Sequence, residues 1–371
     1  MNRRHLLRSL LATGVAAAGW SATLPTLVRP RGLRDGLLAA ALARWQGPRD
    51  DRILRASNPE WDLMARTFTV LALCDLALAE PERRAAHAAV LDRILEDTLQ
   101  VVDSRGHEHY LLSYGAGGGW RGRPRSLFVD GELALMLGAR RMLGGDRWAP
   151  EFREHAAVSR ALMDAGPIGC GESYPDECWT FCNAAARVAL ALGEALDGTP
   201  ADTAGWAARA IPALTEPTTG LLVSSFAYDG TVADGPEGST VWMAATFLQP
   251  VLPALAADQY RRAREHLGRT ALGFGWGREW PADGRIDVDS GPIVPLVEAS
   301  AGSSGHAVVA SRAFGDAAFH DALVASLGLA AFPTRQDDGL TFAAGNAVGD
   351  AVLLFATTVG PLWAAIQERV A

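Results

Sequence analysis

Apolar residues recur with the period of an α-helix in almost every segment from residue 34 onward, and most of them are Ala or Leu. Runs of alternating β-branched residues, which predict strands, are scarce, and only residues 218–232 have the pattern of a short hairpin. The chain is therefore predicted to be all-α. Helices are expected at 34–46, 61–80, 82–103, 127–145, 150–164, 178–196, 201–214, 238–254, 257–272, 293–315, 317–330, 344–358 and 361–370.

The predicted helices come in pairs, in which the first helix is apolar on most sides and the second is charged and amphipathic. Residues 61–80 and 82–103 are one such pair. A helix that is apolar all round is buried, and an amphipathic helix covers it. The apolar members begin near 61, 127, 178, 240, 293 and 344. This spacing predicts an (α/α)6 toroid of about six helix hairpins, with inner and outer rings, in a single domain over 34–371. An irregular helical solenoid or a two-domain helical protein is the alternative.

Polar and aromatic residues collect in the loops just before the predicted inner helices. The inner helices of a toroid run parallel, so these loops would converge at one end of the ring, where helix dipoles favour anions. The richest loop is Cys170–Asn183, which holds three of the four cysteines, three carboxylates, a Tyr and an Asn. We expect the functional site at this end.

The first 28 residues combine Arg3 and Arg4 with a short apolar run of small residues. This is the pattern of a twin-arginine export signal, which predicts a periplasmic or secreted protein. The cleavage signature around 21–23 is poor, so a protein anchored in the membrane by an uncleaved signal is the alternative. No later stretch has 18 uninterrupted apolar residues, and no stable membrane span is expected after signal removal.

Composition removes several function classes. The formal net charge is −8, and no basic tract follows the N-terminus, so nucleic acid is not expected as a partner. All 34 basic residues are Arg, which excludes a Schiff-base lysine, a phosphate-binding Walker lysine and a Ser-Lys pair. Cys178 and Cys182 are four residues apart, but no second ligand pair accompanies them. We therefore predict no metal and no cofactor. The expected partner is a small-molecule substrate, with homo-oligomerisation left open.

The loop Cys170–Asn183 allows two interpretations. In the first, Cys178 and Cys182 are working thiols, and Tyr174, Asp176 and Glu177 carry protons. In the second, the two carboxylates cap the following helix, Trp179 and Phe181 pack, and two cysteines form a disulfide. Cys74 lies in an apolar helical run and is predicted to be an inert core thiol.

Three further positions carry candidate chemistry. Glu132 falls in the first turn of an apolar inner helix, where burial would raise its pKa and suit it to general acid or base catalysis; a helix-capping role is the alternative. Asp287 and Asp289 are two residues apart and could cap a helix or face a polar substrate. His306 falls inside an apolar helix and is predicted to be a core histidine rather than a catalytic one.

The run Pro175–Asn183, Pro-Asp-Glu-Cys-Trp-Thr-Phe-Cys-Asn, resembles the cysteine-bearing segment of the linalool dehydratase-isomerase family. Segments that start at Asp130, Gly220 and Asp287 resemble that family in the same order, so the likeness covers roughly residues 60–330. The resemblance implies an exported, cofactor-independent (α/α)6 enzyme of the kind that interconverts linalool, geraniol and myrcene. It also implies that the family's catalytic cysteine pair corresponds to Ser173 and Cys182, and its catalytic histidine to Glu132. This sequence therefore departs from the family at two catalytic positions.

The sequence-based prediction is an exported lyase or isomerase with hydratase/dehydratase-type proton transfer on a small hydroxylated substrate, terpenoid-like by the resemblance. Cys182 would act as acid or nucleophile and Glu132 as its proton partner, with Tyr174, Asp62 and Asp289 completing the catalytic set. Predicted substrate-binding residues are Ser173, Asp176, Glu177, Trp61, Trp179, Asn183, Asp287 and Trp242.

Two alternatives of other classes are retained. In the first, Glu132, Glu177 and Asp289, with Trp61, Trp120, Trp179 and Trp242, form the stacking cleft of a carbohydrate-active hydrolase or lyase on the same fold. In the second, the chain is a non-catalytic ligand-binding protein.

Overall fold

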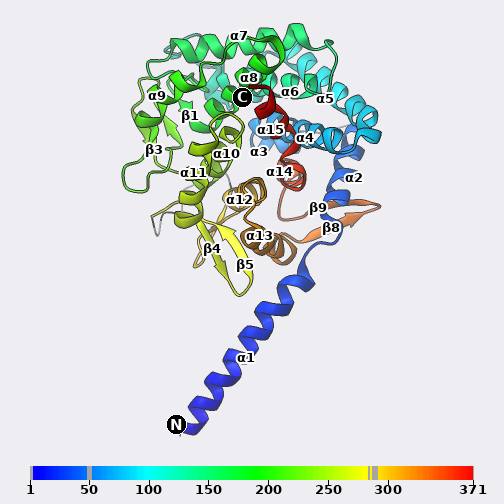
Figure 1. The fold of residues 1–371 in the computed structure, drawn as a ribbon, viewed down its shortest axis with the longest axis vertical. Coiled ribbons are helices and arrows are strands. Elements are labelled where there is room, and N and C mark those ends of the chain that lie inside the picture. The colour runs from blue at the N-terminus through cyan, green and yellow to red at the C-terminus, as the bar shows by residue number, and fades with distance from the viewer. Residues whose placement is uncertain (1–2, 48–51, 283–284, 286–290, 371) are drawn as a thin grey trace.

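The computed structural model describes residues 3–47, 52–282, 285 and 291–370, and it is built mainly of helices, as predicted (Figure 1). Six helices form an inner ring. Each packs against the next in chain order, and the last packs against the first, so the ring is closed. They are α4 (Glu60–Ala79), α6 (Leu127–Arg141), α8 (Thr180–Asp197), α10 (Gly238–Leu248), α12 (Ala301–Ala313) and α14 (Ala347–Thr358). This closure is that of an (α/α)6 toroid.

An outer layer covers these inner helices. Five outer helices each pack on the inner helix that precedes them in the chain. They are α5 (Arg84–Arg105), α7 (Ala149–Ala165), α9 (Thr203–Leu214), α11 (Pro253–His266) and α13 (Ala317–Ala330). The inner members are the more buried because they are the more apolar: on α4, every residue from Ala65 to Ala77 is buried.

The sixth outer position is not filled by the helix that follows α14. Helix α2 (Leu33–Gln46), the second helix of the chain, packs on α14 instead. The last helix, α15 (Pro361–Val370), contacts α4 and α8, which are not neighbours in the ring. The Leu362 N–H donates to Asp75 Oδ1 near the end of α4, at 2.8 Å. Residues 361–370, predicted to pair with the last inner helix, therefore close the end of the ring where the inner helices finish.

Short strands lie in the connections that lead from outer helices to inner ones. β1 (Cys178–Trp179), β2 (Ser225–Phe226) and β3 (Val232–Asp234) form an antiparallel sheet, with Cys178 opposite Phe226. The hairpin predicted at 218–232 thus exists as β2 and β3, joined to the Cys170–Asn183 loop. Three two-stranded hairpins were not expected: β4 (Gly268–Ala271) with β5 (Phe274–Gly277), β6 (Ile293–Val294) with β7 (Ala299–Ser300), and β8 (Pro333–Gln336) with β9 (Gly339–Phe342).

The predicted start of the fifth inner helix was wrong. The helix expected from residue 293 begins at Ala301, because 293–300 fold into β6 and β7. Ser300 caps it, accepting a hydrogen bond from the Ser303 N–H at 3.1 Å. The starts of the other five inner helices lie within three residues of their predicted positions.

The N-terminal helix α1 (Arg3–Val28) projects away from the ring (Figure 1). α3 (Arg52–Ser57) and three 3₁₀ turns, η1 (Pro81–Arg83), η2 (His107–Tyr110) and η3 (Ser113–Ala116), complete the described helical elements.

Candidate functional site

The inner helices begin at one end of the ring, which we call the mouth, and the loop Cys170–Asn183 is fixed there by its own polar groups. Asn183 Nδ2 donates to the carbonyls of Trp179 at 2.9 Å and Gly171 at 3.3 Å, and its Oδ1 accepts from the Gly171 N–H at 3.0 Å. Both amide hydrogens are therefore used by the loop. Asn183, predicted to bind substrate, holds the loop in shape instead.

Glu172 is a second anchor of this loop, which sequence reasoning missed. It is buried, and its carboxylate accepts three backbone N–H groups, from Arg121 at 2.9 Å, Gly122 at 2.7 Å and Asp176 at 2.7 Å. It thereby ties the glycine-rich segment 114–122 to the mouth. Nothing in the sequence separates Glu172 from Asp176 and Glu177, because the backbone it binds is about 50 residues away.

Glu132 occupies the first turns of α6 and is 1% exposed. Its Oε2 lies 2.5 Å from Thr67 Oγ1 of α4, and its Oε1 is buried without a hydrogen-bond partner among the described residues. Burial raises the pKa of this carboxyl from 4.5 to about 8, the Thr67 hydrogen bond opposes that rise, and the charge of Glu60 adds to it. Glu132 is therefore a neutral acid at neutral pH.

The hydroxyl of Thr67 decides which oxygen of Glu132 carries the proton. Thr67 Oγ1 lies 2.5 Å from Glu132 Oε2 and 3.2 Å from the carbonyl of Leu63, but a hydroxyl carries a single hydrogen. The shorter contact takes that hydrogen, so Thr67 donates to Oε2 and lowers the pKa of the carboxyl. The proton of the neutral acid is then on Oε1, which has no hydrogen-bond partner among the described residues.

Cys182, in the first turn of α8, is close enough to Glu132 for the carboxyl charge to act on the thiol. Burial raises the pKa of Cys182 well above its usual value, and the charges of Glu132, Glu60 and Glu177 raise it further. The hydroxyl of Ser173 lies beside the sulfur and opposes this rise, yet Ser173 Oγ has no well-aligned hydrogen bond among the described residues. The thiol of Cys182 therefore stays protonated at neutral pH. In this state Cys182 is suited to donating a proton rather than to attacking as a nucleophile.

Glu60 brings Tyr174 into the same cluster. The Tyr174 hydroxyl donates to Glu60 Oε1 and accepts from the Leu112 N–H at 3.0 Å. The other oxygen of Glu60 accepts from Asn58 Nδ2 at 3.2 Å. Burial and the Glu60 charge raise the pKa of Tyr174. Glu60 was not among the predicted site residues, although it adjoins Trp61 and Asp62, which were.

The rim of the mouth is aromatic. Trp179 Nε1 donates to Glu177 Oε1 at 2.5 Å, and the Tyr114 hydroxyl lies 3.3 Å from both oxygens of the same carboxylate. The Tyr114 ring packs on Tyr174 with 4.6 Å between centroids. Trp61 and Trp179 are half-buried. Glu177 is therefore held at the mouth between two aromatic side chains, partly exposed and close enough for its charge to act on the buried Cys182.

Aromatic side chains fill the ring below the mouth. Phe68 of α4 stacks on Phe247 of α10, the helix opposite it in the ring, with 6.4 Å between centroids. The contact crosses the interior, so both rings face the lumen. Phe181 of α8 packs on Phe247 at 5.5 Å, and Trp363 of α15 forms the floor, 6.1 Å from Phe247. The interior of the ring is therefore apolar and packed, and α15 closes its base.

His306 faces this lumen as well. Its ring lies 6.2 Å from that of Phe68, although α12 and α4 are not neighbours in the ring. Its Nδ1 lies 2.6 Å from the Ser239 carbonyl, so Nδ1 carries the hydrogen and Nε2 the lone pair. Burial lowers the pKa of His306 to about 4, and the imidazole is neutral at neutral pH. His306 was predicted to be a core histidine, but its position makes it a candidate base.

Several predicted site residues lie elsewhere. Trp242 is fully buried with its ring against Tyr260 and Phe319 of outer helices, so it faces away from the lumen. Asp62 binds Arg66 at 3.0 Å and lines a cavity of about 150 Å³ between α2, α4 and α14. The sequence could not show this, because it depends on which face of each helix turns inward.

The remaining predicted residues have other outcomes. Asp176 binds Arg121 at 2.9 Å on the surface and accepts from the Tyr228 N–H at 3.2 Å. Asp287 and Asp289 lie outside the described residues. All four cysteines are free and buried, which disfavours the disulfide alternative. Within the described part of the chain, no three His, Cys, Asp or Glu side chains are grouped as a metal site requires.

The chain was compared with known proteins. No protein-family model and no curated protein matches it. Among solved structures, it is similar to a family 76 glycoside hydrolase from a bovine Bacteroides thetaiotaomicron strain. The identity is 12%, the match covers 82% of this chain and 69% of that chain, and the TM-score is 0.47. So low a likeness carries no functional argument. The resemblance to the linalool dehydratase-isomerase family finds no support in these comparisons and stays a prediction.

Proposed function

We propose that this chain is an enzyme that cleaves or shifts a C–O bond of a small hydroxylated molecule by acid–base catalysis, as a lyase or isomerase. The observation that carries the proposal is Glu132, a fully buried and neutral carboxylic acid with an unpaired oxygen, next to the Cys182 thiol. Ionising Glu132 at this position costs about 5 kcal/mol more than ionising it in water, because burial raises its pKa from 4.5 to about 8. Such costs are concentrated at functional sites.

The proposed reaction starts with proton donation. Glu132 gives its proton to the substrate hydroxyl, the C–O bond breaks, and water leaves with the bonding electron pair. The positive charge left on carbon is stabilised by the faces of Phe68, Phe181 and Phe247, as cations are by aromatic rings. A base then takes a proton from the adjacent carbon to form the double bond, and His306 Nε2 carries the required lone pair. Return of that proton to Glu132 through the released water restores the enzyme.

Cys182 and Ser173 complete the polar wall beside Glu132. Both are neutral donors, suited to holding the leaving water or the substrate hydroxyl rather than attacking carbon. Tyr174 and Glu60 position this wall from the side of α4.

A second candidate is hydrolysis of a glycoside. Its supporting observation is that Glu60 and Glu132 are close enough for one charge to raise the pKa of the other, as in an acid and base pair. Against it, both oxygens of Glu60 are already hydrogen-bonded, to Tyr174 and Asn58. The lyase or isomerase is therefore the proposal we prefer.

The test is turnover by the purified full-length protein on two panels, short unsaturated alcohols and nitrophenyl glycosides, followed by chromatography. We expect loss of water from, or isomerisation of, an alcohol. We expect Glu132→Gln to reduce kcat by at least about 100-fold. Cys182→Ala should also reduce kcat, whereas Cys74→Ala, which removes a buried thiol of α4 outside the mouth, should not.

The pH profile gives an independent check. The rate should fall as pH rises through about 8, where Glu132 loses its proton, and as pH falls through about 4, where His306 gains one. Turnover of glycosides alone would select the second candidate. Full activity of Glu132→Gln, or binding without turnover of either panel, would overturn the proposal.

A further inference from the structure

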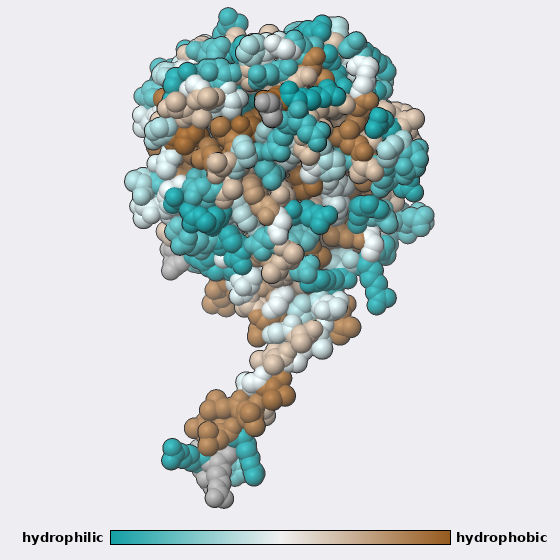
Figure 2. All heavy atoms as spheres, viewed as in Figure 1, coloured by the Kyte–Doolittle hydropathy of each residue, from teal (hydrophilic) through white to brown (hydrophobic). Residues whose placement is uncertain are grey.

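α1 has the dimensions of a membrane-spanning helix. The 20 residues from Ser9 to Val28 carry no charged side chain and are bounded by Arg8 and Arg29. As a continuous helix they are about 30 Å long, the thickness of the hydrocarbon core of a bilayer. Within the described residues, one helical stretch in His5–Gln46 is long and apolar enough to cross a membrane. Only 6% of the apolar 18-residue window in this stretch is buried. Figure 2 shows this helix projecting from the ring, brown or pale over most of its length and teal at its free end.

The end of α1 is fixed to the ring rather than hinged. Gly273, in the β4–β5 turn, lies so close to α1 that a Cβ there would come within 2.5 Å of Pro25 Cγ. A Cβ at Gly328 of α13 would clash with the Val28 carbonyl in the same way. Just beyond the helix, Arg29 binds Asp321 of α13 at 3.2 Å. The orientation of α1 therefore sets which face of the ring would meet a membrane.

Apolar side chains surround this attachment point and face solvent. Leu272 of the β4–β5 turn is 54% exposed, Leu329 at the end of α13 is 49% exposed, and Phe332 is 64% exposed. Leu272 and Phe332 have φ of +50° and +52°, a conformation that is unfavourable for such residues. The chain thus holds two large apolar side chains outward at a cost in backbone energy. Figure 2 shows apolar surface at the base of α1.

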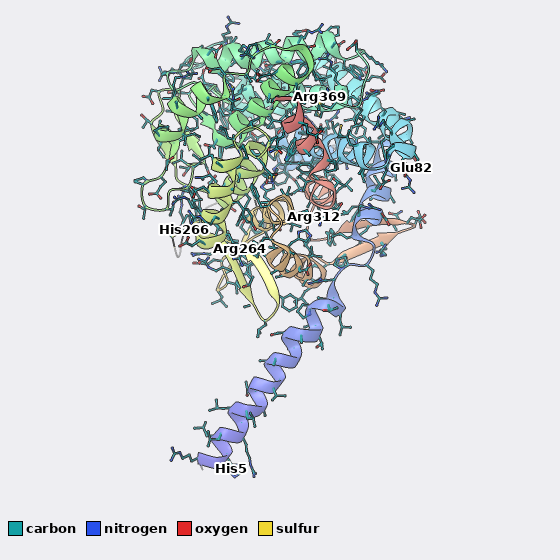
Figure 3. The ribbon with its side chains drawn as sticks, viewed as in Figure 1. His5, Glu82, Arg264, His266, Arg312 and Arg369 are labelled. Carbon is teal, nitrogen blue, oxygen red and sulfur yellow. The ribbon has the colours of Figure 1, made fainter. Side chains whose placement is uncertain are left out.

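The level of these side chains matches the membrane boundary that α1 defines. Gly273 contacts α1 at Ser21 and Pro25, four to eight residues before Arg29. At 1.5 Å per residue, this places the β4–β5 turn about 6–12 Å inside the hydrocarbon boundary that Arg29 marks. His5 lies at the free end of α1, far from the ring (Figure 3).

We propose that α1 is retained as a membrane anchor and that the ring is seated on the phospholipid bilayer, with Leu272, Leu329 and Phe332 inserted beside α1. Arg29 and Arg31 then lie at the level of the lipid headgroups, where arginine side chains are favourable. The membrane covers the apolar surface that the ring leaves open, and α1 and the β4–β5 turn enter it together. The mouth chemistry is independent of this placement.

Two measurements on the full-length protein test the proposal. The first is the intact mass of the protein in carbonate-washed membranes of an expressing bacterium, which should include α1. The second uses single cysteines at Leu272→Cys and Phe332→Cys, each labelled with an environment-sensitive fluorophore in phosphatidylcholine/phosphatidylglycerol vesicles. The native cysteines are all buried, so labelling is selective.

Spin-labelled lipids should quench both labels several-fold more strongly than a label at Val232→Cys. Val232 is 47% exposed on β3, away from α1 (Figure 1). A soluble mature protein that lacks α1 would overturn the anchor. Labels at 272 and 332 that are quenched no more than the one at 232 would overturn the membrane seat. If the labels at 272 and 332 are shielded from water in detergent without lipid, a second copy of the chain covers this face. That result would also overturn the membrane seat.

Discussion

The protonation state of Glu132 can be measured through its effect on stability. Glu132→Gln replaces the neutral acid by an amide of the same shape, and its amide oxygen can still accept from Thr67. Glu132 titrates with a pKa of about 8 in the folded protein, against 4.5 as the ordinary value. Between these two pH values the folded state holds one more proton than the unfolded state, so the free energy of unfolding falls as pH rises.

The magnitude follows from the size of the shift. Each pH unit between 4.5 and 8 should lower the stability of the wild type relative to Glu132→Gln by about 1.4 kcal/mol. The difference should be near zero at pH 4.5, about 3 kcal/mol at pH 7 and about 5 kcal/mol above pH 8. Contributions of all other titrating groups cancel because the two proteins share them.

The assay is urea unfolding of both proteins from pH 5 to 9, with the difference in unfolding free energy plotted against pH. Infrared difference spectra should also show a protonated carboxyl band at pH 7 in the wild type and not in Glu132→Gln. Thr67→Val is the matched perturbation: Thr67 lowers the pKa of Glu132, so its loss should extend the slope to higher pH. Glu82→Gln, on the surface in η1, controls for the loss of one formal charge (Figure 3). A difference that stays flat between pH 5 and 8 would refute the neutral acid.

Two further predictions concern the ring. Gly238→Ala at the start of α10 should lower Tm and destabilise the protein by about 1–3 kcal/mol, because the new Cβ would lie 2.1 Å from Ser303 Oγ and 2.3 Å from the Arg278 carbonyl. Gly235→Ala, three residues earlier with nothing within 4 Å of its Cβ, is the control and should unfold like the wild type; equal Tm values for the two variants would contradict the close packing of α10 on α12. Trp363→Ala should cost about 3–5 kcal/mol in urea unfolding, because it removes the floor that packs on Phe247 and Phe355 at about 6 Å. Trp363→Phe should lose less unfolding free energy than Trp363→Ala. An alanine variant as stable as the wild type would show that α15 does not close the ring.

Local pattern predicted the elements well, because helical periodicity is a property of a few consecutive turns. Five inner helices begin where the apolar runs begin, and the inner and outer assignment follows the apolar and amphipathic faces. The error at residue 293 has the same origin: the Ser- and Gly-rich segment before Ala301 continues a helical pattern, but its backbone pairs as β6 and β7. The predicted pairing of residues 361–370 with the last inner helix was also wrong. A helix that covers a ring and a helix that closes its end can have the same amphipathic pattern.

The site was predicted as a region more accurately than as a set of groups. Glu132, Cys182, Ser173 and Tyr174 do lie together at the mouth, since the starts of parallel inner helices must converge. Their neighbours Glu60, Thr67 and Glu172 were missed, because each acts through a partner about 50 to 115 residues away in the chain. Trp242 and Asp62 were wrongly assigned to the mouth, because rotation of a helix about its axis decides whether a side chain faces the lumen or the outer layer.

The sequence by itself determined the helical class, the number of inner helices and the end of the ring at which reactive side chains gather, because these depend on the order of apolar and polar residues along short segments. Only the tertiary structure decided that α14 closes onto α4, that α15 closes the base of the ring and that, among the described residues, one oxygen of Glu132 is buried without a partner. That last fact governs the chemistry. A carboxyl is an acid or a carboxylate at neutral pH according to the water and charges around it, and residues distant in the chain supply both.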